Sequence, residues 1–96
     1  MTISEFQKLI EAIYFTRDKA RGRDGTFVWF VEEVGELARA LARPRDPEGK
    51  NLREEFADVM AWLSTLASIA GVDLEEAVRQ KYAGGCPKCH SSPCSC

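Results

Sequence analysis

The sequence lacks an apolar run long enough to cross a membrane. Its longest apolar stretch, residues 59–70, is interrupted by Ser64, Thr65 and Ser68, whereas a spanning helix needs about 20 consecutive apolar residues. Residues 1–11 also lack the basic start and apolar stretch of a secretory signal. We therefore expect a cytoplasmic protein with no membrane partner.

Cysteine is missing from the first 85 residues, because all four cysteines lie between Cys86 and Cys96. A disulfide-stapled domain would spread its cysteines through the chain. In a reducing compartment, such clustering favours metal ligands over cross-links. The preceding residues are expected to fold without help from cysteine.

A charge excess of one sign is also missing, since 13 Lys and Arg face 15 Asp and Glu. The balance argues against binding nucleic acid through a basic surface, so no nucleic-acid partner is expected. A chain of 96 residues buries so little surface that a monomer is expected to be only marginally stable. We expect a metal, a disulfide or a partner subunit to add stability.

What the chain does contain is helical periodicity, in four segments with apolar residues three and four positions apart. Capping boxes open three of them, at Thr2, Asn51 and Asp73, and Gly71 supplies a left-handed stop. No strand pattern competes, so we predict an all-α four-helix bundle. The expected helices cover residues 2–20, 26–42, 51–70 and 73–82.

The third predicted helix carries a heptad-type seam and is apolar on most of its remaining surface as well. A helix that is apolar nearly all round is buried on both sides. In so small a chain this predicts a second subunit, in a homodimer or homotetramer. On the first helix, one face is apolar and consists of Phe6, Leu9, Ile10, Ile13 and Tyr14. Of these residues, Tyr14 is expected in the core.

Two helices each carry a pair of acids three residues apart, Glu33 with Glu36 and Glu55 with Asp58. Residues at this spacing share one helix face. If the helices are antiparallel neighbours, the pairs lie level to within about one turn, roughly 5 Å. Four converging carboxylates repel one another unless a cation lies among them. Oxygen ligands suit Mg²⁺ or Mn²⁺, and Mg²⁺ also takes substrate phosphates.

Paired acids on helices are also common on solvated faces, with nearby arginines as ion-pair partners. Arg39 and Arg53 are close enough in sequence to fill that role. A single pair carries almost no information, whereas two pairs in the same relation to adjacent seams are less often met by chance. The pattern alone leaves both interpretations open.

The motif Glu32-Glu33-Val34-Gly35-Glu36, followed after a proline loop by Glu54-Glu55-Phe56-Ala57-Asp58, resembles that of MazG-type nucleoside triphosphate pyrophosphohydrolases. The resemblance covers roughly residues 4–82. It implies a Mg²⁺-dependent, oligomeric enzyme that cleaves a nucleoside or deoxynucleoside triphosphate to a monophosphate and pyrophosphate, in house-cleaning of the nucleotide pool. Phosphoribosyl-ATP pyrophosphohydrolase is an alternative within the superfamily. A non-catalytic, zinc-tailed interaction module is an alternative of another class.

The resemblance also implies roles for individual residues. Glu33, Glu36, Glu55 and Asp58 become metal ligands, and Glu32 and Glu33 become the catalytic residues, with Glu32 handling the attacking water. Lys81 matches a lysine that the family uses on the phosphates. The asparagine and arginine that often follow it are replaced by Gly84-Gly85-Cys86, which puts part of the usual phosphate contact in doubt.

Further substrate contacts are predicted from position. Trp29 and Trp62 each lie four residues from a predicted ligand, toward the same end of the hairpin, so both could flank a pocket and stack on a base. Both also fit the role of core residues. Arg17 could contact phosphate, although a basic residue near a helix end also complements the helix dipole.

The tail contains a CxxC pair, Cys86 and Cys89, and a CxC pair, Cys94 and Cys96. Together they predict a four-cysteine structural zinc site, with His90 as a spare ligand. Disulfides or an iron–sulfur cluster remain alternatives. The expected organisation is a helical domain over residues 1–83 and a zinc-binding tail over residues 84–96.

Overall fold

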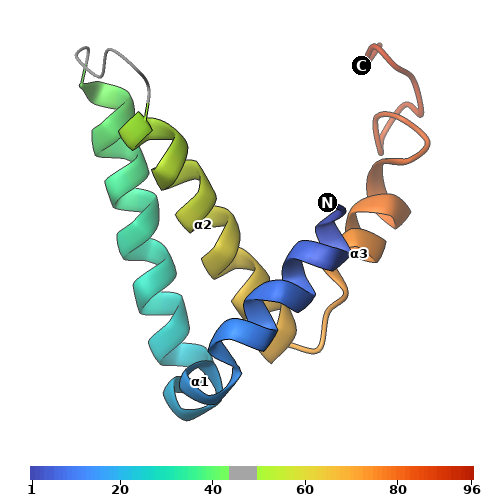
Figure 1. The fold of residues 1–96 in the computed structure, drawn as a ribbon. Coiled ribbons are helices and arrows are strands. Elements are labelled where there is room, and N and C mark those ends of the chain that lie inside the picture. The colour runs from blue at the N-terminus through green and yellow to red at the C-terminus, as the bar shows by residue number, and fades with distance from the viewer. Residues whose placement is uncertain (44–49) are drawn as a thin grey trace.

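A computed structural model describes residues 1–43 and 50–96. These residues form three helices, α1 (Ile3–Ala42), α2 (Lys50–Ile69) and α3 (Leu74–Tyr82). Within these ranges there is no strand, and the predicted all-α class is confirmed. In Figure 1, α2 returns alongside the second half of α1, and α3 lies beside the first half.

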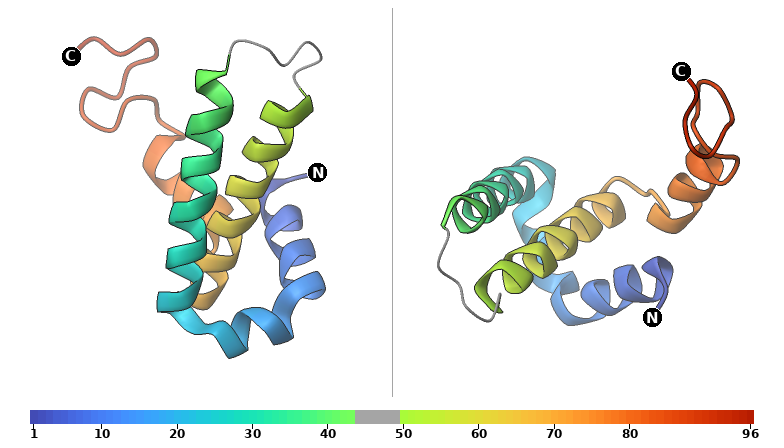
Figure 2. Two further views of the ribbon diagram at one scale, coloured as in Figure 1. Left: turned by 90° about the vertical axis from the view of Figure 1, so that its left-hand side faces the viewer. Right: turned by 90° about the horizontal axis from the view of Figure 1, so that it is seen from above.

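Helix α1 consists of two arms that meet at a kink. Gly22 has φ 77° and ψ −179°, a combination that is essentially restricted to glycine. The polar loop predicted over residues 21–25 is therefore wrong in extent, because the interruption is confined to Gly22. The two arms correspond to the first two predicted helices, and α2 packs between them (Figure 2).

Several helix ends have the capping interactions that the sequence predicted. Thr2 and Glu5 form a reciprocal capping box at α1, and the side chain of Asp73 accepts a hydrogen bond from the backbone of Glu76 at α3. After α2, Gly71 has φ 72°, and the backbone N–H of Val72 donates to the carbonyl of Ala67. Asn51 is not a cap, because α2 already begins at Lys50.

Few apolar side chains are buried within one copy of the chain. Among the described residues, the buried hydrophobic ones are Ile10, Ala40 and Ala67. The predicted burial of Tyr14 is wrong, because this residue is exposed, as are Leu9 and Ile13 on the same face. Ile10 on that face is buried, so the chain covers the face only in part.

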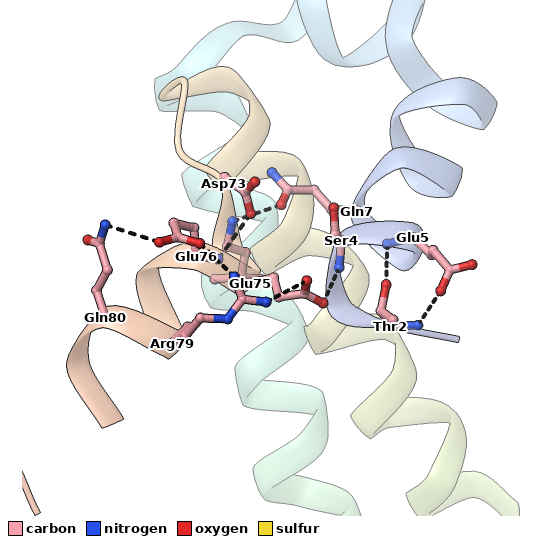
Figure 3. A network of polar contacts seen from close by, with 10 residues as sticks. Thr2, Ser4, Glu5, Gln7, Asp73, Glu75, Glu76, Arg79 and Gln80 are labelled. Carbon is pink, nitrogen blue, oxygen red and sulfur yellow. Dashed lines mark hydrogen bonds and ion pairs between the residues drawn. The ribbon is translucent and has the colours of Figure 1, made fainter. Parts of the chain in front are cut away.

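A polar network joins α3 to the first arm of α1 (Figure 3). The amide of Gln7 donates to the carbonyl of Val72 at 2.8 Å and accepts from the backbone N–H of Leu74 at 2.9 Å. The backbone N–H of Ser4 donates to Glu75 at 3.2 Å. Gln7 is buried, so these bonds satisfy its amide and fix the start of α3.

No single helix in the described part of the chain meets the length and hydropathy needed to cross a membrane. A pair formed by residues 51–69 and 74–82 meets them only jointly, across a bend of 97°.

Candidate metal and nucleotide site

The second arm of α1 and the antiparallel α2 bring three acids together. One carboxylate oxygen from each of Glu33, Glu55 and Asp58 lies within 4.8 Å of the others. Glu33 and Glu55 are half-buried and Asp58 is exposed. Because residues three apart share a helix face, Glu55 and Asp58 meet Glu33 from the same side of α2. Such a group of oxygens can hold a hard divalent cation.

The electrostatics of this acidic cluster (Glu33, Glu55 and Asp58) favour a cation. Burial raises the pKa of Glu33, and the charges of Asp58 and Glu36 raise it further. Burial also raises the pKa of Glu55, followed by the charges of Glu36 and Asp58, while Arg39 opposes them. In addition, Oε2 of Glu55 is buried without a hydrogen-bond partner among the described residues. A cation would supply the missing partner and relieve the repulsion.

The two other predicted acids lie beside the cluster rather than in it. Glu36 does not belong to the group of three close oxygens, although its charge acts on both Glu33 and Glu55. Glu32 is exposed, and its charge is the smallest of the effects that raise the pKa of Glu33. The structure thus places three of the four predicted ligands together and the fourth nearby.

A pocket of about 210 Å³ opens next to the cluster, between the first arm of α1 and α2. Asp58 belongs to both the cluster and the pocket wall, so a ligand held at the acids can extend into it. Two predicted substrate residues, Arg17 and Trp62, line this pocket. It contains both apolar and charged walls, which suits a nucleoside.

The two tryptophans contact each other. Their rings stack with centroids 6.0 Å apart at 14°, and the guanidinium of Arg21 lies over Trp62 at 4.7 Å from the centroid. Trp62 lines the pocket, while Trp29 is not among its lining residues. The predicted pair therefore forms one stack at the pocket edge, not two opposed walls.

Lys81 lies elsewhere in the chain. It is exposed on α3, with its ammonium 5.6 Å from the ring centroid of Tyr82. The right-hand view of Figure 2 shows α2 between α3 and the second arm of α1, which carries Glu33. Within one chain, the structure does not bring Lys81 to the acidic cluster.

Sequence reasoning missed a buried polar network at the kink. Asp18 is buried and accepts hydrogen bonds from Arg21 at 3.1 Å and from Thr65 of α2 at 3.2 Å. Arg21 also donates to Thr26, whose hydroxyl donates to the carbonyl of Gly22 at 2.6 Å. The one local signal was the spacing of Asp18 and Arg21 on a helix, since Thr65 is distant in sequence. This network fixes the angle between the arms and forms part of the pocket wall.

Removing the Asp18 carboxylate should destabilise the protein. In Asp18→Ala, the guanidinium of Arg21 and the hydroxyl of Thr65 lose a buried partner, at a cost of about 2–3 kcal/mol in the free energy of unfolding. Urea unfolding at a fixed protein concentration measures this change. Asp24→Ala is the matched control, because Asp24 is exposed. Equal stability of the two variants would contradict a structural role for the network.

The four cysteines form a second cluster (Cys86, Cys89, Cys94 and Cys96), in the tail. All four sulfur atoms lie within 4.8 Å of one another. The backbone N–H of Ser95 donates to Sγ of Cys89 at 3.3 Å and is the main reason why the pKa of this thiol falls to about 5. The pKa of Cys86 is also lowered, first by the backbone N–H of Cys89. The tail therefore favours thiolates at these two positions.

Comparison with known proteins identifies the chain. A model of the MazG nucleotide pyrophosphohydrolase domain matches residues 21–90. A dATP/dGTP diphosphohydrolase of Cyanophage S-2L is 38% identical over 82 residues, which cover 85% of this chain and 71% of the relative. These matches define the class of the protein, a hydrolase that acts on nucleotides. Within this class, the chain belongs to the MazG nucleotide pyrophosphohydrolase family, as the motif predicted.

Proposed function

We propose that the protein hydrolyses nucleoside or deoxynucleoside triphosphates to monophosphate and pyrophosphate, with Mg²⁺ or Mn²⁺ at the acidic cluster. The observation that carries this proposal is the convergence of Glu33, Glu55 and Asp58 within 4.8 Å, with a buried Glu55 oxygen that has no partner among the described residues. The donor set fits the ion, because hard oxygen ligands are what Mg²⁺ and Mn²⁺ prefer. Family membership supplies the class of reaction.

Each acid has a proposed role. Glu33, Glu55 and Asp58 hold the cation, and Glu36 adds a ligand when its side chain turns toward it. The bound ion would neutralise phosphate oxygens and lower the pKa of a water ligand. Glu32 and Glu33 orient this water and take its proton, since an ionised carboxylate acts as a general base at hydrogen-bond distance.

The pocket next to Asp58 is the proposed place of the nucleoside. Arg17 approaches the phosphates or sugar from the first arm, and Trp62 supplies an apolar edge for the base. The Cyanophage S-2L relative is named for dATP and dGTP, which supports purine deoxynucleotides as substrates in preference to phosphoribosyl-ATP. The protein would act where nucleoside triphosphates are held, in the cytoplasm, by removing unwanted nucleotides.

Trp29 and Lys81 have indirect roles in the proposed substrate site. Trp29 supports the substrate side of the pocket indirectly, because it stacks on Trp62. Lys81 can serve the phosphates only where α3 of another copy comes close to the acidic cluster. Both assignments depend on assembly as well as on the single chain.

We also propose a homodimer or homotetramer. Four apolar residues on one face of the second arm, Phe27, Val31, Val34 and Leu41, are 55%, 51%, 40% and 59% exposed. They form an apolar seam, because the steps between them, four, three and seven residues, match the repeat of a helix. An uncovered seam of this kind is unfavourable in water and is typical of an interface between subunits.

A nucleotide panel tests the reaction. With Mg²⁺, the purified protein should release pyrophosphate from dATP and dGTP faster than from dCTP, dTTP or phosphoribosyl-ATP. Excess chelator should abolish the release, and Glu36→Gln should reduce it about 10- to 100-fold, as expected when a group beside a metal is lost. Glu11→Gln is the control, because Glu11 is exposed on the first arm. Undiminished activity of Glu36→Gln, release of single phosphate, or inactivity on the whole panel would contradict the proposal.

A further inference from the structure

The cysteine cluster has the spacing of a single tetrahedral metal site. The Sγ atoms of Cys86 and Cys94 are 3.6 Å apart, those of Cys86 and Cys96 3.8 Å, and those of Cys89 and Cys94 3.9 Å. Four sulfurs at about 2.3 Å from one zinc ion lie about 3.8 Å from each other in a regular tetrahedron. We infer that residues 84–96 form a knuckle that binds one Zn²⁺ through the four cysteines.

The backbone of the knuckle is organised around this cluster. The N–H of Cys86 donates to the carbonyl of Ser91 at 3.0 Å, and the N–H of His90 donates to the carbonyl of Cys86 at 2.7 Å. These two bonds close the CxxC turn, so that its two sulfurs face the same point. The N–H of Ser95 to Cys89 at 3.3 Å links the CxC pair to this turn. Such bonds orient metal ligands.

Gly85 is required by the geometry of the knuckle. Its φ is +97°, and a Cβ there would lie 2.9 Å from the carbonyl oxygen of Ser91, the same oxygen that accepts the bond from Cys86. Any other residue would be strained and would push this carbonyl away. Gly84 differs, because a Cβ there would meet nothing within 4 Å. The two neighbouring glycines therefore give a matched pair.

His90 has a backbone role in the knuckle. It is exposed, lies outside the group of close ligand atoms and has φ 57°. Its N–H closes the CxxC turn, and the left-handed conformation lets the chain reverse there. The fourth ligand is thus a cysteine, and the imidazole is dispensable.

The sulfur–sulfur distances distinguish a zinc site from a disulfide or an iron–sulfur cluster. A disulfide needs sulfurs about 2.05 Å apart, far less than the 3.6–3.9 Å that separates the pairs Cys86–Cys94, Cys86–Cys96 and Cys89–Cys94. An iron–sulfur cluster divides its cysteines among several irons, whereas all four Sγ atoms lie within 4.8 Å of one another, as the ligands of one ion do. A full shell of four thiolates leaves no position for water or substrate, so the ion is structural.

The knuckle forms a unit of its own at the end of α3. The N–H of Gly85 donates to the carbonyl of Tyr82 at 3.0 Å, which continues the last turn of the helix into the tail. Beyond this point, Figure 1 and Figure 2 show the tail projecting away from α2 and from both arms of α1. Zinc therefore orders residues 84–96, and hydrolysis at the acidic cluster does not depend on it.

Metal analysis of the full chain tests this inference. Protein purified under reducing conditions should carry about one zinc per chain, and cobalt substitution should give the thiolate charge-transfer and tetrahedral d–d bands of a four-sulfur site. Cys89→Ser should lose the ion, while His90→Gly should keep it. Gly85→Ala should weaken zinc binding at least about tenfold through the displaced carbonyl, whereas Gly84→Ala should not.

Three outcomes would overturn the inference: reduced protein without stoichiometric zinc, an iron chromophore, or disulfides found by mass spectrometry in the native protein. Equal zinc affinity of Gly85→Ala and Gly84→Ala would also contradict the described knuckle. Pyrophosphate release is assayed separately, with Mg²⁺, in the same preparations. The zinc content and the proposed reaction are therefore tested independently. Cys89→Ser should retain kcat within about twofold, because a zinc ion with four cysteine ligands has no free position for catalysis.

Discussion

Glu55→Gln should lower kcat for pyrophosphate release by about 10²- to 10³-fold. The substitution removes one of three charges that converge within 4.8 Å, and a catalytic metal contributes several kcal/mol of charge stabilisation in the transition state. Single-turnover measurements at saturating Mg²⁺ separate this loss from weaker substrate binding. Glu54→Gln is the matched control, because Glu54 is the adjacent acid on the exposed side. A rate close to wild type in Glu55→Gln would remove this residue from the site.

Glu55→Gln should lower the activity but raise the stability of the metal-free protein. Burial and neighbouring acids raise the pKa of Glu33 and Glu55 above the ordinary 4.5, so the folded protein binds protons more readily than the unfolded chain. The stability advantage of Glu55→Gln over wild type in chelator should therefore be small near pH 4.5 and grow as the pH rises to 7. Comparing the two proteins cancels the contributions of other titrating groups, such as the Cys89 thiol with its lowered pKa. Glu55→Gln should be more stable than wild type at pH 7 without metal, and it should gain less from added Mg²⁺ in thermal unfolding. A stability advantage of Glu55→Gln that shrinks between pH 5 and pH 7 in chelator would contradict this prediction.

The acidic cluster could be predicted because its geometry is local on each helix. Glu55 and Asp58 share a helix face by spacing alone, and the antiparallel packing of α2 on the second arm of α1 brings them to Glu33. What spacing does not fix is the direction of each side chain. This is why Glu36 lies beside the three close oxygens rather than among them. Helix ends at Thr2 and Asp73 were equally predictable, since the capping groups are a few residues from the helices they begin.

The kink and its network were less accessible to sequence reasoning. Five polar or glycine residues at 21–25 indicated a loop, but a local bond between Asp18 and Arg21 and a tertiary bond between Asp18 and Thr65 hold the helical residues on either side of Gly22. Their energy depends on a partner 47 positions away, which no local pattern reveals. The two tryptophans are a second example. Their sequence positions predicted that both lie at one end of the hairpin, but not whether they stack on each other or on a base.

The apolar pattern of the sequence predicted which helix faces are apolar, but it did not specify which elements bury them. The first arm's Leu9, Ile13 and Tyr14 have the predicted periodicity and yet are exposed in the single chain. Periodicity describes the sum of all contacts in the functional assembly. A face shared between subunits would have the same pattern as one buried within a subunit, so the pattern alone does not say what covers the first arm.

Val31→Glu should break the assembly that such uncovered faces imply. Val31 lies at the middle of the exposed seam on the second arm, with Phe27 and Val34 on either side, and is 51% exposed in the single chain. Burying an unpaired carboxylate in an apolar interface costs about 3 kcal/mol or more, which raises the subunit dissociation constant by about 10²-fold. Sedimentation velocity across a concentration series should show a dimer or tetramer for the wild type and a smaller species for the variant.

Val72→Glu is the matched control for this experiment. It introduces the same side chain at a residue that is also apolar and 44% exposed, but in the turn between α2 and α3, so it should leave the mass unchanged. Val31→Glu should also melt at a lower temperature, since few apolar side chains are buried within one chain and the interface supplies much of the missing burial. Circular dichroism at matched concentrations measures this shift. A wild-type protein that sediments as a monomer, or a Val31→Glu variant with unchanged mass and melting temperature, would show that this seam does not join subunits.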